Sequence, residues 1–266
     1  MPKVSAGEIE LDYERSGEGP PLLAIMGMSG TYLHWGEPFL ERLRESFEVI
    51  VYDHRGVGSS TRLEGPVTIA EMAADAAALI RALEFDAVHV LGISMGGMVA
   101  QELVLGDPEL VRTLTLGCTY CGGPGSSLSP TAGQRLYEAM ATGDRVRALR
   151  VAYELNLSPA AAADGELWER FQSIAAQRAV AVQVIMAQLA ACAAHDTQAR
   201  LPRIDAPTLV IHGSADEMIP VENARLIASL IPEARLEIMD GVGHLFFWEE
   251  PARSAERLRS HAAVPA

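Results

Sequence analysis

The chain has little of several residue types that mark particular protein classes. Lysine occurs once, at position 3, and Lys plus Arg total 21 residues against 35 Asp plus Glu, for a formal net charge of −14. Nucleic-acid surfaces need clustered Lys and Arg, so this balance argues against that class and disfavours anionic membranes. The three cysteines, an odd number, fit a reducing compartment better than a disulfide framework.

Long apolar runs are also missing. The most apolar helix-like stretch, residues 179–194, is interrupted by Gln183 and Gln188, and no uninterrupted run approaches a membrane span. Residues Met1 to Ser5 lack the apolar core of a signal peptide. We therefore expect a soluble, cytoplasmic protein with no membrane partner.

The sequence lacks the common motifs of metal and cofactor sites. No H-E-x-x-H spacing occurs, and no G-x-G-x-x-G follows a strand with an acid downstream, so we expect neither a metal nor a dinucleotide cofactor. Cys118 and Cys121 form a C-x-x-C, but glycines follow it where a redox motif would open a helix. We therefore interpret that spacing as coincidence.

The order of the expected elements indicates an α/β fold. With 266 residues and 49% hydrophobic content, the chain can form one α/β domain with an insertion. Over residues 4–13, apolar and polar side chains alternate in the way expected of a β-hairpin. Apolar segments then alternate with helical patterns, which predicts a mostly parallel sheet with helices on both faces. The expected strands are 22–25, 49–52, 87–93 and 110–116, and the expected helices are 38–46, 69–83 and, at the end of the chain, 249–261.

The pattern changes in the middle of the chain. Residues 121–130 are rich in Gly, Ser and Pro, and from there to about residue 194 only helical periodicity occurs, broken at Gly143 and at Ser158 into about three pieces. The sequence therefore predicts a core formed by residues 1–120 and 200–266, with a helical insertion at residues 121–199.

A possible nucleophile lies between a strand and a helix. Residues 92–96 read Gly-Ile-Ser-Met-Gly, a G-x-S-x-G pattern preceded by the apolar segment 87–91 and followed by a helical pattern. A serine on such a sharp turn is lifted above the sheet, and the flanking glycines prevent backbone clashes. This context predicts that Ser94 is a nucleophile.

Two later loops supply the groups that activate a serine. Asp216 follows the apolar strand pattern of residues 207–212, and His244 follows Gly243 in the glycine-containing loop after the strand pattern of residues 235–239. Acid and base then follow the serine in the order Ser, Asp, His. Glu217 is the competing acid, and we favour Asp216.

These segments resemble the α/β-hydrolase family over nearly the whole chain. Residues 21–28 are similar to the family's first central strand and oxyanion loop, residues 52–60 to its D-x-R-G-x-G-x-S turn, and residues 243–251 to its catalytic-histidine segment. The resemblance implies an oxyanion hole from the backbone amides of Met28 and Met95, and it identifies the helical insertion as a cap. Met26 departs from the family pattern, which usually has His before Gly27.

The resemblance implies a serine hydrolase of carboxylic esters or lactones, with a Ser94–His244–Asp216 triad and no cofactor. The expected partner is a small-molecule ester or lactone, and Trp35 and Phe246 are candidate pocket residues. Three alternatives stay open: a cofactor-free haloperoxidase or perhydrolase, a carbon–carbon bond hydrolase, and a non-catalytic binding protein on the same fold. The natural substrate and the oligomeric state are open at this point.

Overall fold

A single mixed sheet organises the chain, whose structure is a computed structural model that describes residues 2–264. Within these residues the strand order is β1-β2-β4-β3-β5-β6-β7-β8. The hairpin of β1 (Lys3–Ala6) and β2 (Ile9–Ser16) is antiparallel, and β2 also pairs antiparallel with β4. All other pairings are parallel, as predicted. The remaining strands are β3 (Pro21–Ile25), β4 (Glu48–Tyr52), β5 (Val88–Ile93), β6 (Val111–Gly117), β7 (Thr208–Gly213) and β8 (Arg235–Met239).

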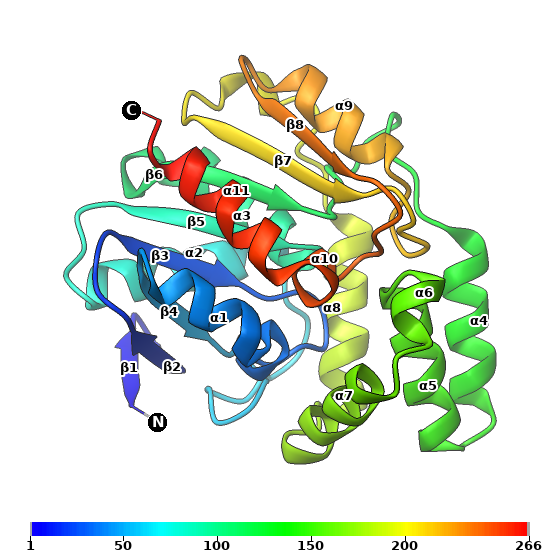
Figure 1. Cartoon of the computed structure of the whole chain (residues 1–266). Helices are drawn as coiled ribbons and strands as arrows, with labels where there is room; N and C mark the ends of the chain where they lie inside the picture. Colours follow the sequence, from blue (N-terminus) through cyan, green and yellow to red (C-terminus); the bar gives the residue numbers. More distant parts are fainter. Residues whose placement is uncertain (1, 265–266) are drawn as a thin grey trace.

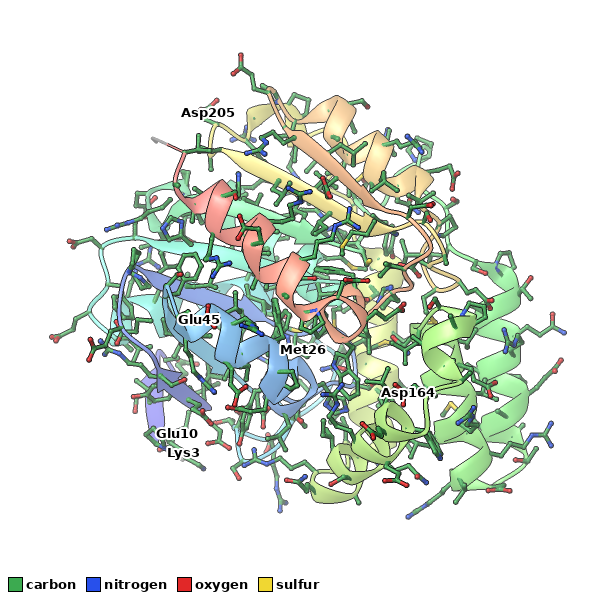
Figure 2. All side chains as sticks on the ribbon, viewed as in Figure 1. Lys3, Glu10, Met26, Glu45, Asp164 and Asp205 are labelled. Carbon is green, nitrogen blue, oxygen red and sulfur yellow. The ribbon has the colours of Figure 1, made fainter. Side chains whose placement is uncertain are left out.

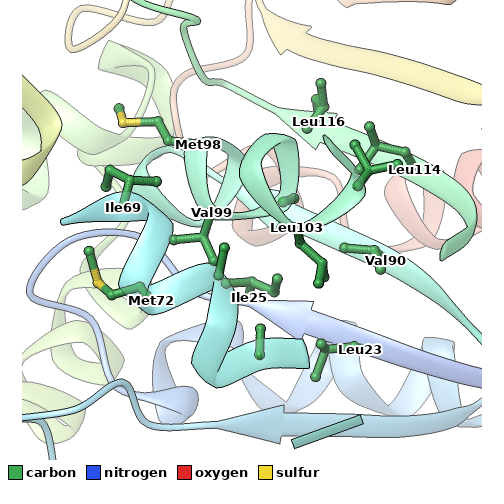
Figure 3. Packing of buried hydrophobic residues seen from close by; sticks show 14 of the residues in the cluster. Leu23, Ile25, Ile69, Met72, Val90, Met98, Val99, Leu103, Leu114 and Leu116 are labelled. Atoms are coloured by element: carbon green, nitrogen blue, oxygen red, sulfur yellow. The ribbon is translucent and has the colours of Figure 1, made fainter. Parts of the chain in front are cut away.

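Helices cover both faces of the sheet because the central strands are apolar on both sides. On β3, Leu23 and Ile25 pack with one buried cluster, while Leu22 and Ala24 pack with the other. Figure 3 shows part of the first cluster, to which Met72, Val99, Leu23 and Ile25 all belong. Its helices are α2 (Ile69–Ala82), α3 (Met95–Gly106) and α9 (Glu222–Leu230), and those of the other face are α1 (Glu37–Arg44) and α11 (Pro251–Ala262).

The expected helix over residues 249–261 corresponds to α11, which begins at Pro251 instead of Glu249. A short helix α10 (Phe246–Glu249) ends before α11, and Glu250 between them has a non-helical backbone (φ −128°, ψ 60°). Pro251 is the cause, since a proline disfavours helical backbone in the residue before it and suits the first position of a new helix.

Five α-helices and the short 3-10 helix η3 (Leu201–Arg203) occupy the stretch between β6 and β7, where the sequence predicted about three helices. The α-helices are α4 (Pro130–Ala141), α5 (Arg145–Asn156), α6 (Pro159–Ala162), α7 (Gly165–Gln177) and α8 (Val182–Ala194). The breaks at Gly143 and Ser158 fall where they were predicted. Two more occur, one at Asp164, whose side chain caps α7, and one at residues 178–181.

This helical insertion lies at one end of the sheet. In Figure 1 its green to yellow-green helices stand together beside the ends of the strands. Figure 2 labels Met26, which follows β3, where the sheet meets the insertion, whereas Lys3 and Glu10 lie together on the terminal hairpin away from it. The carboxyl ends of parallel strands share one edge, so the loops after β3, β5, β7 and β8 meet beneath the insertion.

Membrane-spanning potential was assessed for the helices within residues 2–264. None of them alone is long and apolar enough to cross a bilayer. The pair α7 and α8 reaches the required length and composition only when taken together, and it is bent by 108°.

Candidate active site

Ser94 occupies a strained turn between β5 and α3. Its backbone angles are φ 55° and ψ −122°, a region that non-glycine residues rarely adopt. The flanking glycines are required by close backbone contacts: a Cβ at Gly92 would overlap the carbonyl of Gly96, and a Cβ at Gly96 would overlap the carbonyl of Ile25. The turn is held by a hydrogen bond from the Ser94 amide to the Gly117 carbonyl (2.9 Å).

His244 lies in the loop after β8, and its side chain is largely buried. Its Nδ1 atom is 2.7 Å from Oδ2 of Asp216, so the structure brings together the base and the acid that the sequence selected. The loop is fixed by the insertion. Glu249 accepts hydrogen bonds from the amides of Gly243 (2.9 Å) and Ser158 (2.8 Å), and a Cβ at Gly243 would meet the Ser158 backbone.

Asp216 is a fully buried carboxylate with several donors. Oδ1 accepts hydrogen bonds from the amides of Met218 (2.8 Å) and Ile219 (2.9 Å), while Oδ2 faces the histidines at positions 244 and 212. Burial by itself would raise the pKa of Asp216, but the charge and hydrogen bonds of His244 and His212 outweigh it and hold the pKa well below its usual range. The carboxylate therefore stays ionised beside His244.

Glu217, the competing acid, lies elsewhere. Its side chain is about half exposed and forms an ion pair with Arg135 of α4 at 2.7 Å. The bonding partner of His244 is thus Asp216 and not Glu217.

The two amides expected to form an oxyanion hole lie at suitable places. Met95 is the first residue of α3, where an amide has no acceptor within the helix. Met28 lines the same cavity as Ser94, and a Cβ at Gly27 would come within 3.1 Å of the Ser94 Cβ. The loop is braced from the insertion by a hydrogen bond from the Ser29 amide to Gln188 of α8 (2.9 Å). The role of both amides stays a prediction.

A cavity of about 300 Å³ contains Ser94 and His244 in its wall. The sheet side contributes Met26, Gly27, Met28, Ser29, Gly30, His34, Ile93, Ser94, Met218, His244 and Leu245. The insertion contributes Leu136, Leu149, Ala152, Leu155, Asn156, Phe171, Ala175, Arg178, Ala179, Val180 and Ile185. The cavity is thus mostly apolar and is formed between the sheet and the insertion.

Trp35 and Phe246, the two candidate pocket residues, are absent from this wall, which corrects the prediction. Both side chains are fully buried. Trp35 packs against Phe39 and Phe247, and Phe246 lies against Gly117, where an added Cβ would come within 2.8 Å of its ring. An apolar residue near a catalytic motif can belong to the core as easily as to a pocket, and these two belong to the core.

Arg178 is a site residue that the sequence did not indicate. It lies between α7 and α8, lines the cavity, and contacts Asp12 (2.9 Å) and Asp53 (2.7 Å), two buried carboxylates. Arg55 lies elsewhere, in an ion pair with Asp75. No local pattern marks Arg178, because Asp53 is 125 residues away in the chain.

Cys118, His212 and Asp216 have ligand atoms within 4.8 Å of one another, a spacing that could hold a metal ion. A metal site would need the thiolate form of cysteine. Burial raises the pKa of the Cys118 thiol well above its usual range, and the negative charge of the neighbouring Asp216 adds to this effect. Of the three groups, Asp216 already accepts hydrogen bonds from the Met218 and Ile219 amides and contacts His212 and His244.

Comparison with known proteins identifies the fold family. A family model described as the α/β hydrolase fold matches residues 20–251. Among curated proteins, "Putative carbamate hydrolase RutD" of Azorhizobium caulinodans is 33% identical over 92% of both chains. "Putative non-heme bromoperoxidase BpoC" of Mycobacterium tuberculosis is 30% identical over 97% of this chain and 100% of that protein.

Among solved structures, "Est816 as an N-Acyl homoserine lactone degrading enzyme" is 28% identical to this chain. It covers 97% of this chain and 99% of its own length with a TM-score of 0.79.

Proposed function

Since the chain belongs to the α/β-hydrolase family, we propose that it is a serine hydrolase that cleaves uncharged carboxylic esters or lactones. One observation carries the proposal. Ser94, on a strained turn, and His244, bonded to Asp216, line the same mostly apolar cavity. A serine hydroxyl needs a base, and the base needs an orienting acid, so this set of groups suits acyl transfer.

In the proposed reaction His244 accepts the proton of the Ser94 hydroxyl as the oxygen attacks the substrate carbonyl. Asp216 keeps the ring of His244 oriented and stabilises its charged form. The amides of Met28 and Met95 stabilise the negative oxygen of the tetrahedral intermediate. His244 then gives its proton to the departing alcohol, leaving an acyl-serine. Water, activated by His244, releases the acid and regenerates Ser94.

The cavity supports an uncharged substrate. Its charged side chain, Arg178, contacts two carboxylates, so their negative charge offsets the positive charge that a substrate anion would need. Burial of apolar area against the rest of the wall contributes about 0.8 kcal/mol per methylene group. The solved relative named as a lactone-degrading enzyme supports including lactones.

Perhydrolysis is a second candidate, supported by the relative named as a bromoperoxidase. It would use the same acyl-serine, with hydrogen peroxide in place of water. The peroxide oxygen would attack the acyl carbon, the bond to Ser94 would break, and a peracid would leave.

The experiment compares esters, lactones and half-esters of dicarboxylic acids, and it measures peracid formation in the presence of hydrogen peroxide. Asp216→Asn should reduce kcat by orders of magnitude, and Ser94→Ala should abolish both turnover and labelling by a fluorophosphonate probe. Glu217→Gln is the matched control, because it removes the neighbouring carboxylate that bonds Arg135 instead of His244. Unchanged turnover in Ser94→Ala would exclude this mechanism.

A further inference from the structure

His34 is a polar side chain in the cavity wall that the proposed chemistry does not use. It belongs to the short 3-10 helix η1 (Tyr32–Trp35), which follows the loop after β3. Its Nδ1 atom accepts a hydrogen bond from the backbone amide of Thr31 at 3.0 Å, in a capping arrangement. The Thr31 carbonyl lies farther from the same nitrogen, at 3.3 Å, and the Thr31 hydroxyl at 3.1 Å can also donate to it, so the shorter contacts favour a lone pair on Nδ1. The proton of the neutral ring is therefore on Nε2.

Both the backbone and the ring of His34 have further contacts. The carbonyl of His34 accepts a hydrogen bond from Nε1 of Trp248 at 2.7 Å, and the ring meets Phe171 edge to face with centroids 6.1 Å apart. Burial lowers the pKa of His34 to about 4. At neutral pH His34 is thus an uncharged donor in a fixed orientation.

The donor has no protein acceptor among the residues that the structure describes. Within residues 2–264, the hydrogen bonds of the His34 ring all use Nδ1. Nε2 is the ring nitrogen left for a ligand in the cavity that also contains Ser94. A fixed N–H in a mostly apolar wall favours a ligand that places an uncharged acceptor there, since leaving the donor without a partner after water is displaced is unfavourable.

We propose that Nε2–H of His34 recognises a second, uncharged oxygen of the substrate, beyond the scissile carbonyl group. This inference rests on the proposed function and narrows it. The preferred substrates are esters or lactones that carry an ether, keto or amide oxygen in the acyl chain or ring, and not plain alkyl esters. His34 is a specificity-determining residue that leaves the acyl transfer itself to Ser94 and His244.

The test uses isosteric esters in which one oxygen replaces one methylene group. They are p-nitrophenyl pentanoate, p-nitrophenyl 3-methoxypropanoate and p-nitrophenyl ethoxyacetate. Comparing each kcat/KM in a variant with that in the wild type cancels the intrinsic reactivity of the esters. His34→Asn keeps an oxygen where Nδ1 accepts from Thr31 but has no donor at the position of Nε2. We expect this variant to lose about fivefold to tenfold more kcat/KM on at least one alkoxy ester than on pentanoate.

His34→Gln is the converse control. Its amide nitrogen can reach the position of Nε2, but it has no acceptor for the Thr31 amide. It should keep the alkoxy preference while the melting temperature falls. If His34→Asn does not fold, His34→Phe removes the donor, keeps a ring against Phe171 and serves the same comparison.

Equal losses on all three esters in the folded donor-free variant would overturn the role of His34, even with Ser94-dependent turnover intact. Absence of turnover in the wild type, or turnover that survives Ser94→Ala, would instead remove the proposed function and this inference with it. The two failures are therefore distinguishable.

Discussion

The Nε2 atom of His212 lies 3.1 Å from Oδ2 of Asp216, the carboxylate oxygen that also bonds His244. The same nitrogen lies 2.9 Å from the carbonyl oxygen of Ile219. Both neighbours are acceptors, so a neutral His212 carries its proton on Nε2. His212 therefore helps to fix the carboxylate that orients His244, although it lies outside the cavity wall.

Replacing His212 should change catalysis more than substrate binding. His212→Phe removes a hydrogen bond to an ionised carboxylate, and we expect a loss of about tenfold to a hundredfold in kcat with little change in KM. His212→Gln retains an N–H at a similar distance and should recover most of this activity. Steady-state kinetics and the pH profile of kcat/KM check the prediction. A folded His212→Phe variant with wild-type kcat would contradict it.

The contacts of Arg178 should stabilise the packing of the insertion against the sheet. One nitrogen of its guanidinium group, Nη1, contacts the carboxylates of both Asp12 and Asp53, whose side chains are 2% and 0% exposed. Burial raises the pKa of Asp53, with the Tyr32 amide and Arg178 opposing this effect. Arg178→Met leaves both carboxylates without this charge and should lower the free energy of unfolding by about 2–4 kcal/mol.

A second-site change supplies the control for Arg178. Asp12→Asn removes one of the two negative charges, so in the Arg178→Met background it should be less destabilising than in the wild type, or even stabilising. Denaturant unfolding of the four proteins measures the coupling. Additive effects of the two substitutions would show that the contact between Arg178 and Asp12 contributes nothing to stability.

The wall contributed by the insertion should set chain-length selectivity. Leu149 of α5 lines the cavity, whereas Val146 on the same helix is 64% exposed and does not. Leu149→Ala enlarges the cavity and should raise the ratio of kcat/KM for octanoate over acetate p-nitrophenyl esters by about threefold or more. Val146→Ala should leave the ratio unchanged. A ratio that moves equally in both variants would mean that the effect does not come from the wall.

Some features of the site could be predicted from sequence because local sterics dictate them. Gly92 and Gly96 are required by backbone contacts within a few residues of Ser94, or with β3 beside it, so a short pattern records the turn. Asp216 and His244 were predictable because each follows a strand that ends at the same edge of the sheet. A residue that directly follows a parallel strand in the sequence can therefore be assigned to this edge of the sheet.

Other features were beyond the sequence because they depend on packing between distant segments. Trp35 and Phe246 have the composition of a pocket wall, yet their side chains point into the core. Arg178 meets Asp53 across 125 residues, and nothing in its neighbourhood marks it. The number of insertion helices was also underestimated, since the break at Asp164 depends on a side-chain cap that is only one of several uses of an aspartate.

His195 should make the stability of the fold depend on pH. This side chain is buried between Tyr120 and Glu102, and burial lowers its pKa to about 4 from the ordinary 6.5, with Glu102 opposing the shift. Between these values the unfolded chain binds one proton more than the folded chain at this residue. The free energy of unfolding should therefore fall as the pH drops from about 6.5 to about 4, by up to about 3 kcal/mol from His195.

His195→Gln cannot titrate, so its stability should decline less steeply over this range, and the comparison cancels the other ionisable groups. Urea unfolding at half-unit pH steps measures both slopes, and parallel curves for the two proteins would refute the assignment.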